Sequence, residues 1–214
     1  MEMESLHELY VDELKDLYSA EKQIVKALPK MVKNATNPEL KEAFSNHLDE
    51  TEGHVQRLEK IFQMLGEKAG GKKCKGMEGL IEEEKELLEE DAAEEVLDAG
   101  LISKAQHVEH YEMAGYGTVR TYAEQLGFAD QAKLLQQTLD EEGKANELLT
   151  QIAESSVNLD AETGSEEEES TSRSDRQVSR SVATEGARGR GTSGRGGRGG
   201  SRTTSRASHA RSRS

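Results

Sequence analysis

Apolar residues recur at three- and four-residue spacing along four long segments of this chain, and that periodicity limits the possible folds more than any other feature of the sequence. Only two prolines occur, Pro29 and Pro38, and runs of β-branched residues are absent. The pattern therefore predicts helices. We expect Pro29 to bend or locally break the first helix, because proline removes one backbone hydrogen bond.

The remaining helix boundaries follow from caps and glycines. Asn37, Pro38 and Glu39 have the pattern of a cap, a first-turn proline and a first-turn acid, which begins a second helix that ends at Gly66. A Gly/Lys-rich loop over residues 67–76 leads to an acidic helical connection over 77–97, whose charges we interpret as a solvated face. A third core helix over 98–126 and a fourth over 130–153 complete an all-α, antiparallel, ferritin-like four-helix bundle with a long helical central connection.

Composition divides the chain into two parts. Residues 170–214 contain 11 Arg, 11 Ser and 8 Gly but no aromatic residue, so they cannot bury enough apolar surface to offset the entropy lost on ordering. We expect a helical bundle over 1–158 and a disordered tail, acidic and then Arg/Gly/Ser-rich, over 159–214. Residues 170–214 carry +9 and the whole chain −14, which leaves −23 for residues 1–169. A body this acidic repels polyanions and attracts cations.

Cysteine content and hydropathy indicate the cellular compartment. Cys74 is the only cysteine, so no internal disulfide can form, and we expect an ordinary free thiol. No stretch of about 18 apolar residues is present, and the acidic start does not have the pattern of a signal peptide. We therefore expect a cytoplasmic protein without membrane contact.

A faint internal repeat relates two halves of the helical region. A shift of 91 residues lays Glu21 on Glu112, and Leu48-Asp49-Glu50 on Leu139-Asp140-Glu141. Two helical hairpins related by a pseudo-twofold axis would account for this match.

Ionisable residues interrupt the apolar stripes of all four core helices. They are Glu21 on the first helix, His47, Glu50 and His54 on the second, Glu112 on the third, and Glu141 or Glu142 on the fourth. Burying a carboxylate without a partner costs several kcal/mol, so a seam with four of them needs cations or protons. Arg57 and Lys144 are the basic residues that could reach it. Two divalent ions bridged by carboxylates would neutralise about four negative charges.

Each of these residues also has a plainer interpretation. A single glutamate on an apolar stripe is more often a surface residue whose head group reaches water. His47 or His54 alone is more often a buried histidine with satisfied hydrogen bonds than a ligand. Tyr18 and Tyr116 are expected to be core residues bonded to the carboxylates, with a redox role as the alternative. The pseudo-symmetric placement of four glutamates favours a dinuclear metal site over these interpretations.

Five segments of the sequence are similar to one known family. YSAEKQ (18–23), HLDET (47–51), GMEGLIEE (76–83), VEHYEMAGYGT (108–118) and LDEE (139–142) together resemble the YciF/YciE ferritin-like family over about residues 5–157. The resemblance implies a helical bundle, usually a homodimer, that is associated with bacterial stress responses and often described as a ferroxidase. It implies two iron ions, with manganese or zinc as alternatives.

The family pattern also implies a set of ligands. Ferritin-like proteins place one Glu on the first and third helices and a Glu-x-x-His on the second and fourth. Four carboxylates match, but Gly53 and Lys144 stand where the two histidines would be. Glu109, one turn before Glu112, could supply an extra carboxylate. The predicted metal ligands are therefore Glu21, Glu50, His54, Glu109, Glu112 and Glu141, with His47, Glu142, Tyr18 and Tyr116 as second-rank candidates.

Two functions from different classes are consistent with this sequence. The first is a ferroxidase-like stress protein that oxidises Fe(II) with O2 or peroxide. The second is a non-catalytic metal-binding or structural module whose tail contacts nucleic acid. Arginine spaced by glycine presents mobile guanidinium groups to phosphates, although a flexible solubilising tail is the plainer interpretation. The tail arginines in question are Arg188, Arg190, Arg195, Arg198 and Arg202.

Overall fold

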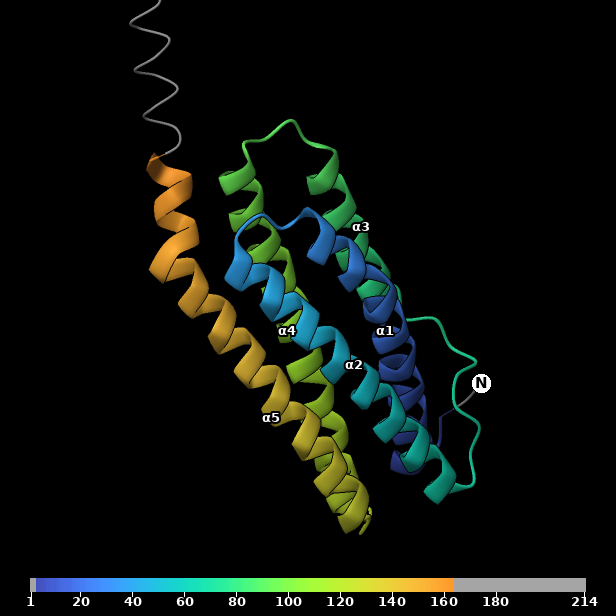
Figure 1. Ribbon diagram of the computed structural model, residues 1–214. Helices are drawn as coiled ribbons and strands as arrows, with labels where there is room; N and C mark the ends of the chain where they lie inside the picture. Colours follow the sequence, from blue (N-terminus) through green and yellow to red (C-terminus); the bar gives the residue numbers. More distant parts are fainter. Residues whose placement is uncertain (1–2, 164–214) are drawn as a thin grey trace, which may run out of the picture. The chain divides into compact units, whose positions relative to one another are not determined.

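Five α-helices make up most of residues 3–163, the part of the chain that this computed structural model describes (Figure 1). They are α1 (Leu6–Asn34), α2 (Pro38–Leu65), α3 (Lys75–Glu89), α4 (Glu94–Gln125) and α5 (Ala129–Ile152), and a short π-helix, Ala153–Val157, follows α5. Helical residues then continue to Thr163, beyond the predicted end of the bundle at residue 158. The predicted disordered tail and its arginines lie outside the described residues, apart from this first helical stretch. No described helix is both long enough and apolar enough to cross a membrane.

The helices form two hairpins, as the repeat predicts. In Figure 1, α2 runs back along α1, and α5 runs back along α4. The hairpins meet through α1 against α4 and through α2 against α5, and α3 packs on the outer side of α1 and α4. The fold is the expected all-α four-helix bundle, and α3 is its central connection.

Local signals in the sequence explain where these helices begin and end. Ser5 and Glu8 form a capping box at the start of α1, and the Asn37 side chain accepts hydrogen bonds from two first-turn amides of α2. Gly66 ends α2 in the left-handed conformation, with φ of 70°, which a residue without Cβ adopts at little cost. These caps fix the lengths of α1 and α2 and so the register between them.

Three details differ from the prediction. The helix α1 continues through Pro29, which is exposed. The break between connection and third core helix falls at residues 90–93, so α4 begins at Glu94 and not at residue 98. The acidic run of α3 is not wholly a solvated face either, because Glu84 is buried.

The core has two apolar clusters with a polar layer between them. One cluster includes Ile24, Phe44, Leu101 and Leu149, and the other includes Leu14, Leu58, Tyr116 and Leu135. On the core helices, Glu21, His47, His54, Glu109, Glu112 and Glu142 fall between the two clusters, whereas the buried Asp98 lies near the start of α4. Gly115 permits α1 to approach α4 beside this layer, because a Cβ there would lie 2.7 Å from Leu17 Cδ2.

Candidate metal centre

Six buried ionisable side chains form the polar layer. They are Glu21 of α1, His47 and His54 of α2, Glu109 and Glu112 of α4, and Glu142 of α5. All are at most 7% exposed. Four carboxylates and two imidazoles therefore converge at the middle of the bundle, and each of the four core helices supplies at least one.

The ligand atoms fall into two groups that share one residue. Glu21, His54 and Glu142 form the first group, and His47, Glu109, Glu112 and Glu142 form the second. Within each group, one ligand atom from every residue lies within 4.8 Å of the others. Glu142 belongs to both, so its two oxygens are placed to bridge two ions.

The first group is centred on Nδ1 of His54. This atom lies 2.9 Å from Glu142 Oε1 and 3.5 Å from Glu21 Oε1, although neither contact has the alignment of a hydrogen bond. The hydroxyl of Tyr116 donates a hydrogen bond to Glu21 Oε1. Glu21 is thereby held on one oxygen, while its second oxygen has no hydrogen-bond partner.

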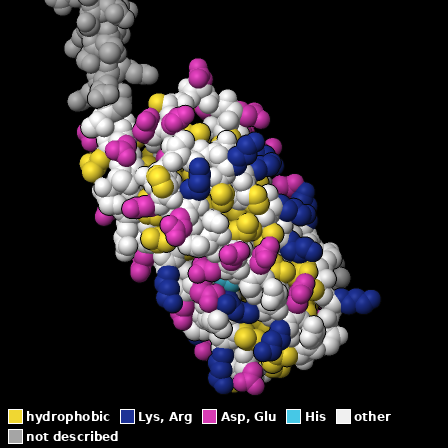
Figure 2. Space-filling view, viewed as in Figure 1, with side chains coloured by type: hydrophobic (Ala, Val, Ile, Leu, Met, Phe, Trp, Pro, Cys, Tyr) yellow, Lys and Arg dark blue, Asp and Glu magenta, His cyan; other side chains and the backbone are white. Residues whose placement is uncertain are grey.

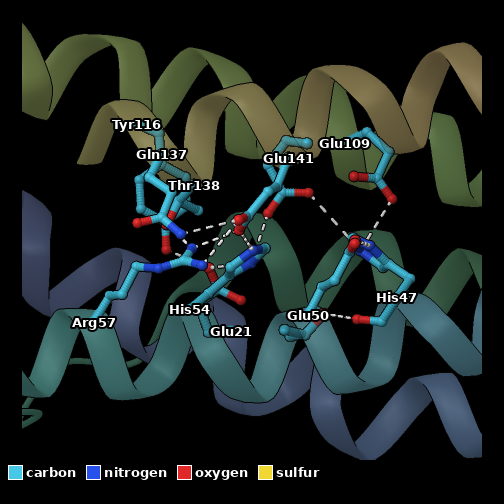
Figure 3. A network of polar contacts seen from close by, with 12 residues as sticks. Glu21, His47, Glu50, His54, Arg57, Glu109, Tyr116, Gln137, Thr138 and Glu141 are labelled. Carbon is cyan, nitrogen blue, oxygen red and sulfur yellow. Dashed lines mark hydrogen bonds and ion pairs between the residues drawn. The ribbon is translucent and has the colours of Figure 1, made fainter. Parts of the chain in front are cut away.

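The second group is centred on Nε2 of His47. This atom lies 3.3 Å from Glu109 Oε1 and 3.8 Å from Glu142 Oε2. The other ring nitrogen, Nδ1, faces Glu50, and Figure 3 shows Glu109 above the His47 ring. Neither oxygen of Glu112 has a hydrogen-bond partner, although the residue is fully buried.

Burial dominates the acid–base behaviour of the layer. Loss of hydration raises the pKa of Glu109 and of Glu112 well above the ordinary value, and neighbouring carboxylates raise both further. Burial also raises the pKa of Glu21, against the opposing effect of His54. Burial alone would lower the pKa of His54, but Glu142 and Glu21 raise it to about 10. The metal-free layer therefore holds protons at neutral pH that bound cations would displace.

The unpartnered atoms test whether a metal fits. The buried atoms without a hydrogen bond include Glu21 Oε2, Glu109 Oε2, both oxygens of Glu112 and Glu142, both nitrogens of His47, and His54 Nδ1. Such atoms are rare in folded proteins, because leaving one unpaired costs roughly 1–3 kcal/mol. All are oxygen or imidazole donors, which suit iron, manganese or zinc. The residues present fit a dinuclear centre.

Glu141 and Glu50 were predicted as ligands, and the structure places neither in the two ligand groups. Glu141 accepts two hydrogen bonds from the Arg57 guanidinium, at 2.6 and 2.9 Å, and its Oε2 lies 3.0 Å from His54 Nε2 (Figure 3). The side chain of Glu50 is half exposed, and its Oε2 lies 3.7 Å from His47 Nδ1. Each of these glutamates therefore contacts a histidine at the ring nitrogen that points away from the ligand groups.

The pseudo-twofold relation does not extend to the histidines, because the repeat lays His47 on Thr138 and His54 on Ala145. The repeat pairs Glu50 with Glu141, and both occupy the same place behind a histidine. It pairs Glu142 with Thr51, which is buried and hydrogen-bonds the backbone oxygen of His47. A threonine therefore stands where symmetry would put a second bridging carboxylate, and Glu109 supplies the additional carboxylate from α4.

Tyr116 and Tyr18 have different surroundings. Tyr116 lies in the layer, bonded to Glu21, as predicted. Tyr18 does not contact these carboxylates: its hydroxyl donates to Glu59 Oε1 at 2.9 Å, and its ring packs edge-on against Phe62. Tyr18 therefore belongs to the apolar cluster next to the layer.

A bundle of four core helices around buried glutamates and histidines that could hold a metal ion fits the class of ferritin-like folds. The chain belongs to the YciF-type family, whose description is "Domain of unknown function (DUF892)" and which matches residues 5–162. It is 45% identical over 163 residues to protein YciF of Escherichia coli K12, a match that covers 76% of this chain and 98% of the relative.

Solved structures agree with this assignment. The crystal structure of the E. coli stress protein YciF matches with a TM-score of 0.70 and 44% identity, over 73% of this chain and 99% of that one. YcfI from Rhodopseudomonas palustris matches with a TM-score of 0.68 and 43% identity, over 70% and 95% of the two chains. A protein from Xanthomonas campestris shares the fold at 20% identity, with a TM-score of 0.62 over 75% and 99%.

Two features of the structure were missed by sequence reasoning. Arg57 was noted only as a possible counter-charge, yet it fixes Glu141 with a bidentate contact. Glu84 was assigned to a solvated run, although it lies three or four residues from Ile81 and Leu88 on the apolar stripe of α3. That spacing was the available signal for its burial.

Proposed function

We propose that this protein binds two divalent metal ions in the polar layer and, when the ions are iron, oxidises Fe(II) with O2 or peroxide. The observation that supports the proposal most strongly is the buried Glu112, whose two oxygens lack hydrogen bonds among three other carboxylates. Protons could also neutralise these carboxylates, but two divalent ions would bind the carboxylate oxygens and the imidazole nitrogens together. Two ions would satisfy both kinds of donor.

The donor set favours ions that accept oxygen ligands. One ion would be held by Glu21, His54 and one oxygen of Glu142, and the other by His47, Glu109, Glu112 and the second oxygen. One imidazole and several carboxylates per ion suit iron or manganese, and zinc is also compatible. Thiolate-preferring ions are disfavoured, because no cysteine lies in either group.

Fe(II) is the substrate in the proposed reaction: two Fe(II) ions give up one electron each, and these two electrons with two protons reduce O2 to hydrogen peroxide, or hydrogen peroxide to two waters. The carboxylates suit this change because more negative ligands stabilise the higher charge of Fe(III). Tyr116 keeps Glu21 oriented through its hydrogen bond, and Arg57 with Glu141 keeps His54 oriented. The apolar clusters on both sides exclude water from the layer.

A protective role under stress extends this proposal. The E. coli relative is described as a stress protein. We assign the same role and a cytoplasmic location to this chain, because removal of free Fe(II) and of peroxide would limit oxidative damage. A homodimer is part of the proposal, and sedimentation of the full-length protein tests it directly.

A non-catalytic metal-binding module is the second candidate. Thr51 supports it, because the chain has one bridging carboxylate, Glu142, where a symmetric centre would have two. In this case recognition would fall to the Arg/Gly-rich tail, acting on nucleic acid. A gel shift in rising salt, comparing the full-length protein with a chain that ends at Thr163, tests the tail. Equal binding of nucleic acid by both proteins would contradict recognition by the tail.

Anaerobic loading followed by oxygen exposure separates the two candidates. The full-length protein is loaded with two equivalents of Fe(II), and near-ultraviolet absorbance from ferric iron is followed after oxygen is added. The enzymatic proposal predicts that this absorbance rises rapidly in wild type and does not rise above background in a Glu112→Ala/Glu142→Ala variant. Asp140→Asn, at an exposed position, is the matched control. Tight Fe(II) binding without faster oxidation would favour the non-catalytic module.

A further inference from the structure

An apolar cavity of about 190 Å³ lies beside the metal centre. All five helices contribute to its wall, which is mostly aliphatic and aromatic. The exposed members of the wall are on α2 and α5, so the cavity opens between these helices. Hydrophobic side chains are visible on this face in Figure 2, and Leu148 at the opening is 44% exposed.

Polar residues interrupt this wall, and Asn46, Glu50 and Lys144 are its exposed polar members. His47 and Glu109 bring the second metal group to the edge of the cavity. Glu84 reaches it from α3, which lies on α1 and α4. The Glu84 side chain is buried, at 4% exposure, and its Oε1 has no hydrogen-bond partner. Glu84 Oε1 is therefore a buried acceptor on the cavity wall that no described donor bonds, although the charges of Lys30 and Lys85 act on this carboxyl.

The volume and the wall limit what could bind. A dry cavity of about 150 Å³ lined by Leu, Ile and Phe holds benzene, so this one has room for a single ring with a short substituent. Three carboxyl groups, of Glu50, Glu84 and Glu109, line the cavity against one ammonium group, of Lys144 on its exposed side, so the wall disfavours an anionic group. A donor group on the ligand would satisfy Glu84 Oε1.

We propose that this cavity binds a small single-ring molecule that carries one hydrogen-bond donor, a hydroxyl or an amino group. The ring lies among the apolar side chains, and the donor group bonds Glu84 Oε1. A molecule held there lies next to His47 and Glu109. The metal centre therefore has an organic binding site at its edge, and binding to this site does not require a metal.

Calorimetric titration of the metal-free, full-length protein with benzyl alcohol tests this proposal. We expect a Kd in the range of about 0.1–1 mM, within the limits known for ligands of this size. Glu84→Leu should weaken benzyl alcohol at least about tenfold, the usual effect of losing a buried hydrogen bond, without weakening toluene, which has no donor. Benzoate should not bind at the same concentrations.

Two further variants control for other causes. Glu82→Leu changes an exposed glutamate of the same helix and should bind benzyl alcohol as wild type does. Ala145→Leu fills part of the cavity from a half-buried position and should weaken both benzyl alcohol and toluene. Equal benzyl alcohol affinity in wild type and a folded Glu84→Leu would overturn the proposal, as would unchanged binding in Ala145→Leu. Either failure would leave metal binding by the polar layer unaffected.

Discussion

His54 Nε2 lies 3.0 Å from Glu141 Oε2, and the other ring nitrogen, Nδ1, faces Glu142 and Glu21. A neutral imidazole carries one proton. If Nε2 donates that proton to Glu141, Nδ1 is left free to bind a metal. Arg57 holds Glu141 through two hydrogen bonds and keeps its pKa below the ordinary value, against the effect of burial. The pair Arg57–Glu141 therefore sets which face of His54 serves the centre.

Replacing Glu141 should weaken metal binding without removing a site. Loss of such an outer partner typically costs 10–100-fold in metal affinity, so we expect that range for Glu141→Gln, with two ions still bound at saturation. Competition with a chelating dye, using Mn(II) or Co(II), measures both quantities. Asp140→Asn, one residue away and exposed, is the matched control. Loss of one whole equivalent of metal would show that Glu141 is a ligand after all.

Replacing Glu112 should stabilise the metal-free protein. Glu112→Gln keeps the shape and removes a buried carboxyl that faces Glu21, Glu142 and Glu109. Replacement of buried charges by neutral groups often gains about 1–2 kcal/mol, and that gain would raise Tm by roughly 2–8 °C for a chain of this size. Thermal melts in the presence of chelator measure it. Glu82→Gln should change little, and a lowered Tm in Glu112→Gln would contradict the electrostatic account.

Metal-free stability should fall as pH rises from about 5 to 8. The folded pKa values of Glu21, Glu109 and Glu112 are raised above the ordinary value. Their contribution to the free energy of unfolding is therefore complete below about pH 4.5, the ordinary pKa, and it declines as pH rises toward the folded pKa values. His54 acts in the same direction. Its stabilising contribution is complete below about pH 6.5 and is lost as pH rises through about 10, its folded pKa. Glu142, whose pKa the His54 imidazole lowers against burial, acts oppositely and loses its contribution in acid.

Bound metal replaces these protons, so the rise in Tm on loading should grow over the same pH interval. Calorimetry at pH 5.5, 6.5 and 7.5, with and without Mn(II), measures the difference. Titrations in buffers of different ionisation enthalpy should also show proton release on binding. A metal-induced rise in Tm that shrinks with increasing pH is the contrary result.

Replacing Asp98 should lower the stability of the fold and leave the metal centre intact. Its carboxylate accepts hydrogen bonds from the Thr36 amide and hydroxyl and from the Asn37 amide, at 2.7–2.9 Å, and so holds the turn between α1 and α2. Asp98→Ala should cost about 2–3 kcal/mol, because these are charge-assisted bonds. Denaturant titration measures the loss, and metal stoichiometry should stay unchanged. A large change in stoichiometry would show that the centre depends on this turn.

The bundle and its buried layer were predictable because each core helix carries a long stripe with few interruptions. Asn37 and Gly66 mark helix ends with side-chain chemistry that acts locally, so those boundaries could be predicted closely. The start of α4 could not, because Ala93 forms no side-chain cap and the flanking acids suit either a helix or a connection.

The choice between Glu141 and Glu142 shows why the ligands were harder to assign. Helical spacing alone favours Glu142, which lies seven residues from both Leu135 and Leu149. The repeat and the family pattern both favoured Glu141. The structure separates the two roles: Glu142 points into the layer, and Glu141 turns toward Arg57. Such contacts between helices cannot be read from the periodicity of one helix.

Metal stoichiometry tests the central claim most directly. The full-length protein is loaded with Mn(II) or, without oxygen, with Fe(II), then desalted and measured by elemental analysis beside a Glu142→Ala variant. Because Glu142 serves both ligand groups, the account predicts about two ions per chain in wild type and fewer than one in the variant. Wild type that retains no metal, or a variant that retains the same two ions, would contradict it.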